Sequence, residues 1–394
     1  MGTGGDAVIR VALLGVDAQT LALARAAEDS RQFELAGACD LESCPDAGAA
    51  AALLASFPRL RQFDAWESLL TGQQADVVIV ARSKYEDLRA EQLRKLIQTS
   101  VPVMTSHPVQ DSMLVYYELD MIRRDTNSLA MPYLPERHHP AVQAVRAIVA
   151  QGDASALGAV EQVIVQRRAV STDKRTIVAQ FARDVDVIRA VAGDMTRLGA
   201  MAGTQQPDSY AGLGVQMSGP ASVAARWSVD PPQAEPGGQL TVLAAQGKAV
   251  IEMRPDGAPW TLELSTGGRT DRQAFESWSP AAAALEQLAE ALAGAAPQPD
   301  WVDASRAVEL AETIERSLHK SRTIDLYYED YTEQGTFKGL MTSIGCGLLI
   351  FGLMVMGFVA IGDHLGLPVK KAWAYVLAGG MGIFLLLQLL MLVF

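Results

Sequence analysis

The sequence predicts an α/β protein in three parts: an N-terminal doubly wound parallel sheet, a second α+β domain with an open mixed or antiparallel sheet, and a C-terminal two-helix transmembrane hairpin. Three observations predict this architecture. Apolar strand-like runs alternate with helical patterns in residues 1–133, as they do in parallel βαβ units. Consecutive strand-like runs with short turns dominate residues 134–326. Two long uncharged runs lie within residues 339–394.

Apolar, β-branched runs define the first domain. Residues 76–81 are apolar at almost every position, which is typical of a strand buried on both faces of a parallel sheet. A charged amphipathic pattern at 84–99 predicts a helix that covers this sheet. Further strands are expected at 8–14, 33–39, 101–105 and 128–133, and further helices at 17–27, 47–56 and 109–124.

The second domain has a different pattern, because strand-like runs there follow one another directly. Turn residues such as Pro231-Pro232 and Gly237-Gly238 separate them, which favours antiparallel or mixed pairing. The strands are expected at 159–170, 212–217, 222–228, 239–246, 248–254 and 259–265. The helices are expected at 140–150, 176–192, 279–294 and 303–319, followed by a polar linker at 327–338.

The last part of the chain contains two uncharged runs, 339–362 and 372–394. At a rise of about 1.5 Å per residue, each run is long enough to cross a hydrocarbon core of about 30 Å. The short connection at 363–371 would join two such helices as an antiparallel hairpin. Trp373 and Tyr375 lie where an interfacial aromatic belt is expected. The alternative is a pair of helices buried in a protein core.

The composition excludes several classes of function. The formal net charge is −12, and an acidic chain is poorly suited to neutralise the phosphates of a nucleic acid. Cys39, Cys44 and Cys346 are too few for a disulfide framework or a zinc site. We therefore expect a reducing compartment, no metal and no nucleic-acid partner.

The placement of the chain relative to a membrane depends on two opposing signals. The N-terminus lacks the basic region of a signal peptide, which favours cytoplasmic domains. Lys370 and Lys371, between the two runs, favour a cytoplasmic loop and therefore the reverse orientation. Because the export signal is missing, we expect a two-pass protein of the cell inner membrane with both folded domains in the cytoplasm.

The turn after the first strand is a candidate phosphate-binding site. In the dinucleotide motif G-x-G-x-x-G, glycines allow a tight turn, close approach of a pyrophosphate and close helix packing. Here Gly15 is followed by Asp17 and Thr20 at the other two glycine positions. The side chain of Asp17 is better suited to cap the following helix. Asp40 ends the second strand, where an acidic residue would bond an adenosine ribose or begin a turn.

The order of these features resembles the Gfo/Idh/MocA family of glucose–fructose oxidoreductase and inositol dehydrogenase relatives. After the degenerate glycine turn and Asp40 come a motif ending in Pro108, an R-x-x-P motif and a D-x-D helix. The resemblance covers about residues 8–326 and leaves the hairpin outside. It implies a Rossmann-like dinucleotide-binding domain at 1–133, a substrate and dimerisation domain at 134–326, NAD or NADP as cofactor, a sugar or polyol ligand, and a homo-oligomer.

The family's E-K-P motif corresponds to Ser106, His107 and Pro108 in this sequence. The resemblance places the cofactor near these residues and assigns the lysine position to His107. With an ordinary pKa near 6.5, a histidine there could transfer protons. The alternative is a polar loop residue that precedes a proline.

The family's histidine-containing helix corresponds to the segment around Arg183. Arginine stays protonated at neutral pH and cannot act as a base. Asp184 and Asp186 match the D-x-D part, although a solvated helix face also explains them. Arg137 matches the R-x-x-P motif. The resemblance therefore implies substrate contacts for Arg137, Arg183 and Asp184.

Two hypotheses remain open from the sequence. In the first, the chain is a catalytically degenerate relative, a pseudoenzyme that binds a ligand or partner at the membrane or acts as a scaffold. In the second, it is an active NAD(P)-dependent oxidoreductase on a sugar or polyol, with His107 in place of the family lysine. The losses at the glycine turn, at His107 and at Arg183 favour the first.

Overall fold

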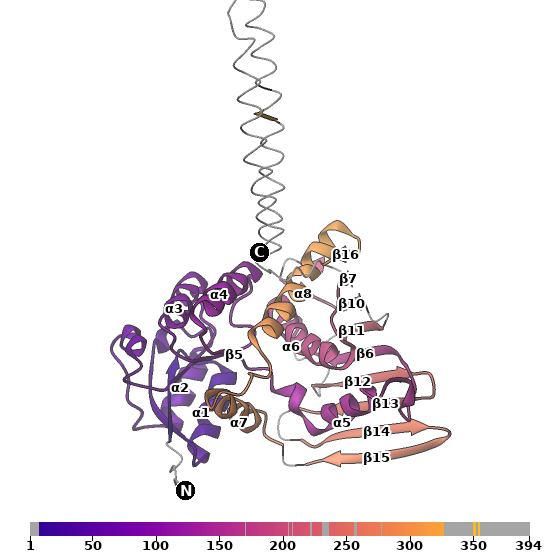
Figure 1. The fold of residues 1–394 in the computed structure, drawn as a ribbon, viewed down its shortest axis with the longest axis horizontal. Coiled ribbons are helices and arrows are strands. Elements are labelled where there is room, and N and C mark those ends of the chain that lie inside the picture. Colours follow the sequence, from indigo (N-terminus) through magenta and orange to yellow (C-terminus); the bar gives the residue numbers. More distant parts are fainter. Residues whose placement is uncertain are drawn as a thin grey trace, which may run out of the picture. The chain divides into compact units, whose positions relative to one another are not determined.

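The computed structural model describes most of the chain up to Leu326 and three residues beyond it. The described residues are 8–169, 171–203, 205–206, 208–220, 223–230, 236–255, 258–276, 278–326, Ile350, Phe351 and Met354. The described residues up to Leu326 belong to one compact unit, which contains both large sheets (Figure 1).

The first sheet confirms the predicted parallel βαβ arrangement. Its five strands pair in parallel in the order β2-β1-β3-β4-β5. The strands are β1 Ile9–Leu14, β2 Phe33–Cys39, β3 Val77–Val80, β4 Val103–Thr105 and β5 Ala130–Pro132. The helices between them are α1 Ala18–Asp29, α2 Ala47–Ser56, α3 Glu86–Gln98 and α4 Met113–Thr126. Because the strands are parallel, their carboxyl ends meet at one edge of the sheet.

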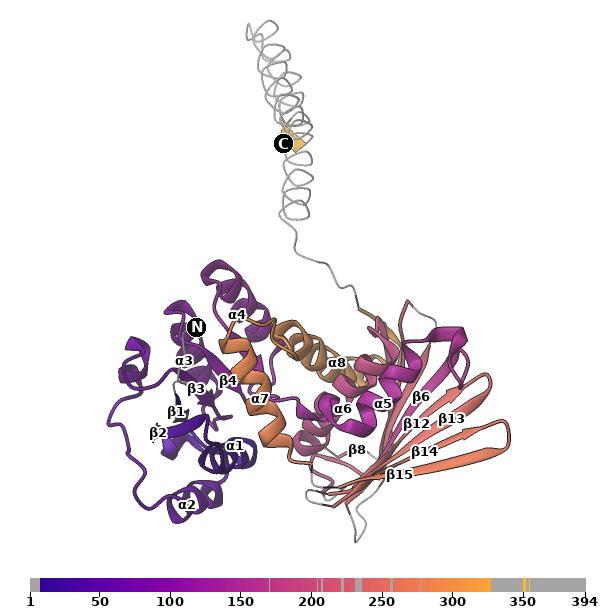
Figure 2. The same ribbon diagram turned by 60° about the horizontal axis from the view of Figure 1, so that its bottom comes forward.

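Helices cover both faces of this sheet. Buried side chains of α1 and α2 form one core with β1 and β3, and those of α3 and α4 form another on the opposite face. Two helices from the end of the unit complete these cores: α7 Pro280–Leu292 joins the first, and α8 Trp301–Lys320 joins the second (Figures 1 and 2). Trp301 of α8 is fully buried, stacks on Tyr116 at 5.2 Å and donates to its carbonyl oxygen at 3.0 Å.

The second sheet confirms the predicted open, mixed arrangement. Its nine strands lie in the order β15-β14-β13-β12-β6-β11-β10-β7-β16, and β6 pairs in parallel only with β11. The helices α5 Pro140–Val149 and α6 Lys174–Ala192 pack against it. The strands are β6 Val160–Arg168, β7 Arg197–Ala202, β10 Leu213–Ser218, β11 Ala224–Asp230, β12 Gly237–Ala244, β13 Gly247–Met253, β14 Trp260–Thr266, β15 Arg269–Phe275 and β16 Ile324–Asp325; β8 Gln205–Gln206 and β9 Ser209–Tyr210 form a separate pair.

Three strands of this sheet, β7, β15 and the two-residue β16, are absent from the sequence prediction. β7 contains no β-branched side chain, and β15 consists mostly of exposed polar and charged residues. Neither composition carries the β-branched, alternating pattern that identifies a half-buried strand. β15 is recognised only through its pairing with β14 at the end of the sheet.

Within the part of the chain that is described, no helix combines the length and the apolar composition needed to cross a bilayer. The predicted spans at 339–362 and 372–394 lie outside the described residues, apart from Ile350, Phe351 and Met354.

Candidate functional site

The turn between β1 and α1 lies at the carboxyl edge of the parallel sheet. Gly15 has a φ of 75°, a left-handed conformation that glycine adopts without strain. Asp17 caps α1, and its Oδ1 accepts from the backbone N–H of Thr20 at 2.9 Å. The hydroxyl of Thr20 in turn accepts from the backbone N–H of Asp17 at 2.8 Å. The capping role considered for Asp17 is therefore confirmed.

The second carboxylate oxygen of Asp17 connects three loops of this edge. Oδ2 accepts from the Ser106 hydroxyl after β4 at 2.5 Å and from the Arg82 backbone N–H after β3 at 3.0 Å. A helix N-terminus with converging donors is a general anion-binding arrangement. In this chain the anion is the protein's own carboxylate.

A buried arginine from α3 occupies the space next to Gly15. Arg89 is 0% exposed, and its Nη2 donates to Asp40 Oδ2 at 3.2 Å and to Ser43 Oγ at 3.0 Å. A Cβ placed on Gly15 would lie only 2.6 Å from this nitrogen. Burial lowers the pKa of Arg89, although the negative charge of Asp40 opposes that change. The guanidinium therefore fills the space beside Gly15.

Asp40 is held by several side chains of the same edge. Its Oδ2 accepts from Arg89, from Ser43 Oγ at 2.8 Å and from Gln92 Nε2 at 3.2 Å. Its backbone has a φ of 55° and begins the short helical turn Leu41–Ser43. Asp40 is therefore both a turn residue, as one alternative expected, and the ion-pair partner of Arg89.

The loop that carries His107 is fixed to α1 by an amide. Gln19 Nε2 donates to the His107 carbonyl at 2.9 Å, and Gln19 Oε1 accepts from the His107 backbone N–H at 2.8 Å. The His107 ring is 1% exposed and meets Tyr116 edge-on at 6.3 Å. Burial lowers the pKa of His107 to about 3, and the positive charge of Arg183 adds to this effect. The imidazole is therefore neutral at pH 7.

Arg137 lies in a buried ion-pair network. Its Nε donates to Asp186 Oδ2 at 2.8 Å, and its Nη1 donates to Asp303 Oδ2 at 2.7 Å. Arg189 also donates to Asp303, at 3.2 Å. The network joins the turn η3 (Pro135–His138) to α6 and α8. Both charges of the Arg137–Asp186 pair are thus satisfied within the protein.

Asp184 and Arg183 are adjacent on α6 but have different surroundings. Asp184 is 3% exposed and accepts from Arg167 Nε at 2.8 Å, from Trp227 Nε1 at 2.8 Å and from Gln180 Nε2 at 3.0 Å. The solvated face considered for Asp184 and Asp186 is therefore wrong. Arg183 donates to the neutral amide oxygen of Gln180 at 2.6 Å.

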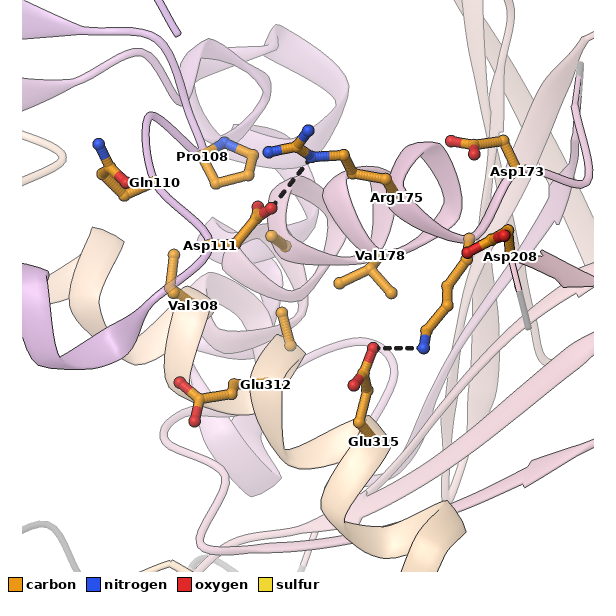
Figure 3. Close-up of a pocket in the computed structure, with 13 residues that line it drawn as sticks. Pro108, Gln110, Asp111, Asp173, Arg175, Val178, Asp208, Val308, Glu312 and Glu315 are labelled. Carbon is orange, nitrogen blue, oxygen red and sulfur yellow. Dashed lines mark hydrogen bonds and ion pairs between the residues drawn. The ribbon is translucent and has the colours of Figure 1, made fainter. Parts of the chain in front are cut away.

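Two cavities lie on opposite sides of α6. The first, of about 470 Å³, is shown in Figure 3 between Pro108, α6 and α8. Its basic groups are paired, Arg175 with Asp111 at 3.0 Å and Lys174 with Glu315 at 2.7 Å. The second, of about 270 Å³, lies between α6 and the second sheet, and its lining includes Arg167, Arg168, Arg183, Arg254, Glu136 and Trp260.

The structure brings some of the predicted residues together and separates others. Asp17, Thr20 and Ser106 form one hydrogen-bonded cluster, and Asp40 forms a second one with Arg89. Arg137 and Asp184 belong to separate buried ion pairs. The sequence prediction missed Gln19, Arg82, Arg89, Arg167 and Arg254, because charged or amide side chains in a helix or loop give no local sign of where they point.

The adjacent histidines have separate structural contacts. His138 Nε2 lies 3.0 Å from the Gln298 carbonyl oxygen, and His139 Nδ1 accepts from the Ala141 backbone N–H at 3.1 Å. The His139 ring also stacks on Trp260 at 4.0 Å. Among the residues that the structure describes, no three His, Cys, Asp or Glu side chains form a group that could hold a metal ion.

Comparisons with known proteins identify the fold. No family model and no curated protein matches the chain. An oxidoreductase from Agrobacterium radiobacter, solved with NAD+, L-tartaric acid and magnesium, has 16% identity and a TM-score of 0.67 over 81% of this chain and 98% of its own. A putative myo-inositol dehydrogenase from Sinorhizobium meliloti has 19% identity and a TM-score of 0.64 over 81% and 100%.

A third structure widens this comparison to another activity. Biliverdin reductase from Synechocystis, solved with biliverdin and NADP+, has 13% identity and a TM-score of 0.63 over 79% of this chain and 99% of its own. These structures have the two-domain fold that the sequence resemblance implied. Over about four-fifths of its length, the chain therefore has the fold of Gfo/Idh/MocA-type NAD(P)-dependent oxidoreductases.

Proposed function

We propose that this protein is a non-catalytic ligand-binding relative of the Gfo/Idh/MocA-type oxidoreductases, held at a membrane by residues 339–394. One observation carries the proposal: the carboxylate of Asp17 occupies the anion position at the N-terminus of α1. A bound pyrophosphate needs the same donors and the same positive end of the helix. A negatively charged side chain in this position repels that ligand and competes for its hydrogen bonds.

The surroundings of Gly15 support the same proposal. Close approach of a pyrophosphate requires open space beside this glycine, and the Arg89 guanidinium fills it. Asp40, the candidate partner of an adenosine ribose, is bonded to Arg89, Ser43 and Gln92. The residues of this site therefore do not fit a dinucleotide as they are arranged.

The residues at the expected catalytic positions also argue against turnover. A general base works best when its pKa lies near the operating pH. Burial lowers the pKa of His107 to about 3, and Arg183 remains protonated. The alternative, an active oxidoreductase that uses His107, would need a histidine able to exchange a proton near neutral pH. The buried and neutral imidazole disfavours it.

The remaining features of the proposal come from the sequence. The two uncharged runs at 339–362 and 372–394 would form the membrane hairpin, with both folded domains in the cytoplasm. A reporter fused after Phe394 should then remain cytoplasmic, since both ends of the hairpin lie on one side. The open sheet of the second domain would support a homo-oligomer.

The proposal is tested by titrating the full-length protein with NADH and NADPH, with binding followed by the fluorescence of the nicotinamide. We expect no saturable binding up to about 1 mM, which corresponds to a binding free energy weaker than about −4 kcal/mol. Saturable binding together with turnover of a sugar or polyol would overturn the proposal and restore the oxidoreductase hypothesis.

Changing Asp17 to glycine should increase the affinity for NADH by at least about tenfold, because it removes the competing carboxylate and restores a glycine of the motif. Asp46→Gly is a matched control, since Asp46 caps α2 and accepts from the backbone N–H of Gly48 at 2.8 Å, away from this turn. Each change removes one helix cap, at a cost of about 1 kcal/mol of stability or less. Asp17→Gly also removes the acceptor of the Ser106 hydroxyl and of the Arg82 N–H, so thermal unfolding must show that this variant is folded. Equal NADH affinities for the two variants would show that Asp17 does not close the site.

A further inference from the structure

The cavity between α6 and the second sheet has an unusual wall. Four arginines line its volume of about 270 Å³: Arg167 and Arg168 from β6, Arg183 from α6, and Arg254 just after β13. Glu136 is the carboxylate among its lining residues. The larger cavity on the other side of α6 has the opposite balance, with five carboxylates and two basic groups in its wall. The two sides of one helix therefore present different chemistry.

Nearby carboxylates neutralise only part of this positive charge. Asp184 pairs with Arg167, and Glu252 lies 3.6 Å from Arg254. Arg183 donates to the uncharged amide of Gln180. Glu136 opposes the arginines only while it is ionised, and burial raises the pKa of its carboxyl group. Arg183 therefore brings to the wall a positive charge that is paired with no carboxylate of the described residues.

Two polar atoms of the wall are buried without a hydrogen-bond partner in the described residues. They are Nε of Arg183, a donor, and Oε2 of Glu136, which accepts when ionised. Buried polar groups in native proteins are nearly always paired, and an orphaned one costs about 1–3 kcal/mol. Both atoms belong to side chains that line the cavity, one a cationic donor and the other a carboxyl oxygen.

The size and the remaining lining restrict this ligand. A volume of about 270 Å³ lies just below the range of roughly 300–1,000 Å³ that is usual for drug-sized ligands. Trp227 and Trp260 add apolar surface beside the arginines. Guanidinium groups bind phosphate through paired N–H donors, with a geometry that favours phosphate and carboxylate oxygens. The combination fits a small, hydroxylated and doubly charged molecule.

We propose that this cavity binds a monosaccharide phosphate, with the phosphate against Arg183 and Arg254 and a sugar hydroxyl directed to Glu136. The inference rests on the proposed function, because it identifies the ligand class of a protein that binds without turnover. It requires no dinucleotide, and its outcome can therefore be separated from the outcome of the NADH titration.

The test is calorimetric titration of the full-length protein with hexose and pentose phosphates, their unphosphorylated sugars, inorganic phosphate and L-tartrate. We expect saturable binding of at least one sugar phosphate and an affinity at least about tenfold weaker for the matching free sugar. Binding of tartrate without any sugar phosphate would overturn the phosphate assignment. The absence of saturable binding for every probe would overturn the site itself.

Substitutions in the cavity wall test where the sugar phosphate binds. Arg183→Gln and Arg254→Gln should each lower the affinity for the sugar phosphate by at least about tenfold, because each removes a charged donor from the wall. Arg272→Gln is the matched control: Arg272 lies 3.8 Å from the same Glu252, is 60% exposed on β15 and does not line the cavity. Thermal unfolding checks that the variants fold. If Arg272→Gln lowers the affinity for the sugar phosphate as much as the other two substitutions do, the ligand does not bind in this cavity. Turnover of NADH would overturn only the proposed function.

Discussion

Replacing Arg137 by alanine should lower the free energy of unfolding by about 3–5 kcal/mol, the cost of leaving a buried charge without its partner. Arg137 is 6% exposed and Asp186 is 1% exposed, so little water can replace the lost contact. The change also removes the bond from Arg137 Nη1 to Asp303. One substitution thus leaves two carboxylates without this cation at the junction of η3, α6 and α8.

The pKa of Asp303 explains the direction of this effect. Burial alone would raise the pKa of this carboxyl group. The charges of Arg137 and Arg189, together with hydrogen bonds from Arg137 and from the Asp300 backbone N–H, outweigh burial and lower the pKa. A lowered folded-state pKa contributes stability above the unfolded value and loses it as the pH falls through the folded value. Without Arg137, Asp303 contributes less to the free energy of unfolding at neutral pH. The buried carboxylates of Asp186 and Asp303 then destabilise the folded state.

Urea unfolding followed by circular dichroism measures the difference. Arg10→Ala is a matched control, because Arg10 also makes a two-pronged pair with an aspartate, Asp76, but at side-chain exposures of 42% and 43%. Exposed pairs contribute only about 0–1 kcal/mol. If Arg137→Ala and Arg10→Ala lower the free energy of unfolding by the same amount, the Arg137 network does not stabilise the fold. Its residues could then bind a ligand instead.

The fold could be predicted because hydrophobic patterns carry most of its information. The apolar run at 76–81 corresponds to β3, Val77–Val80, which is fully buried. The pattern at 84–99 corresponds to α3, Glu86–Gln98. Such patterns record which face of an element is buried. They do not record pairing partners, so the charged strand β15 was not predicted.

The candidate site could be predicted only where its chemistry is local. Asp17 and Thr20 are three residues apart, so their reciprocal capping follows from the sequence. The donors to the other oxygen of Asp17 come from Arg82 and Ser106, which lie 65 and 89 residues away. Arg89 lies on a charged helix, where an arginine is expected in solvent. Its complete burial depends on the tertiary packing of α3 against the turn at Gly15.

The buried, neutral His107 should make the folded protein less stable at low pH. Burial lowers the pKa of His107 from 6.5 to about 3, so between these values the unfolded chain binds a proton that the folded chain does not. Stability from this group is present above the unfolded pKa and is lost as the pH falls below it. Between pH 7 and pH 4.5 the loss should be about 2–3 kcal/mol, at about 1.4 kcal/mol per pH unit.

His107→Gln should remove this part of the pH dependence, whatever it does to stability at pH 7. The measurement is the difference in unfolding free energy between pH 7 and pH 4.5, compared between the variant and the unchanged protein. His319→Gln is the control, because His319 is exposed in the last turn of α8 and its replacement should leave the difference unchanged. An unchanged difference in His107→Gln would mean that the imidazole is accessible to protons in the folded protein. That result would favour the oxidoreductase hypothesis, since a base that exchanges protons near pH 7 is what that hypothesis requires.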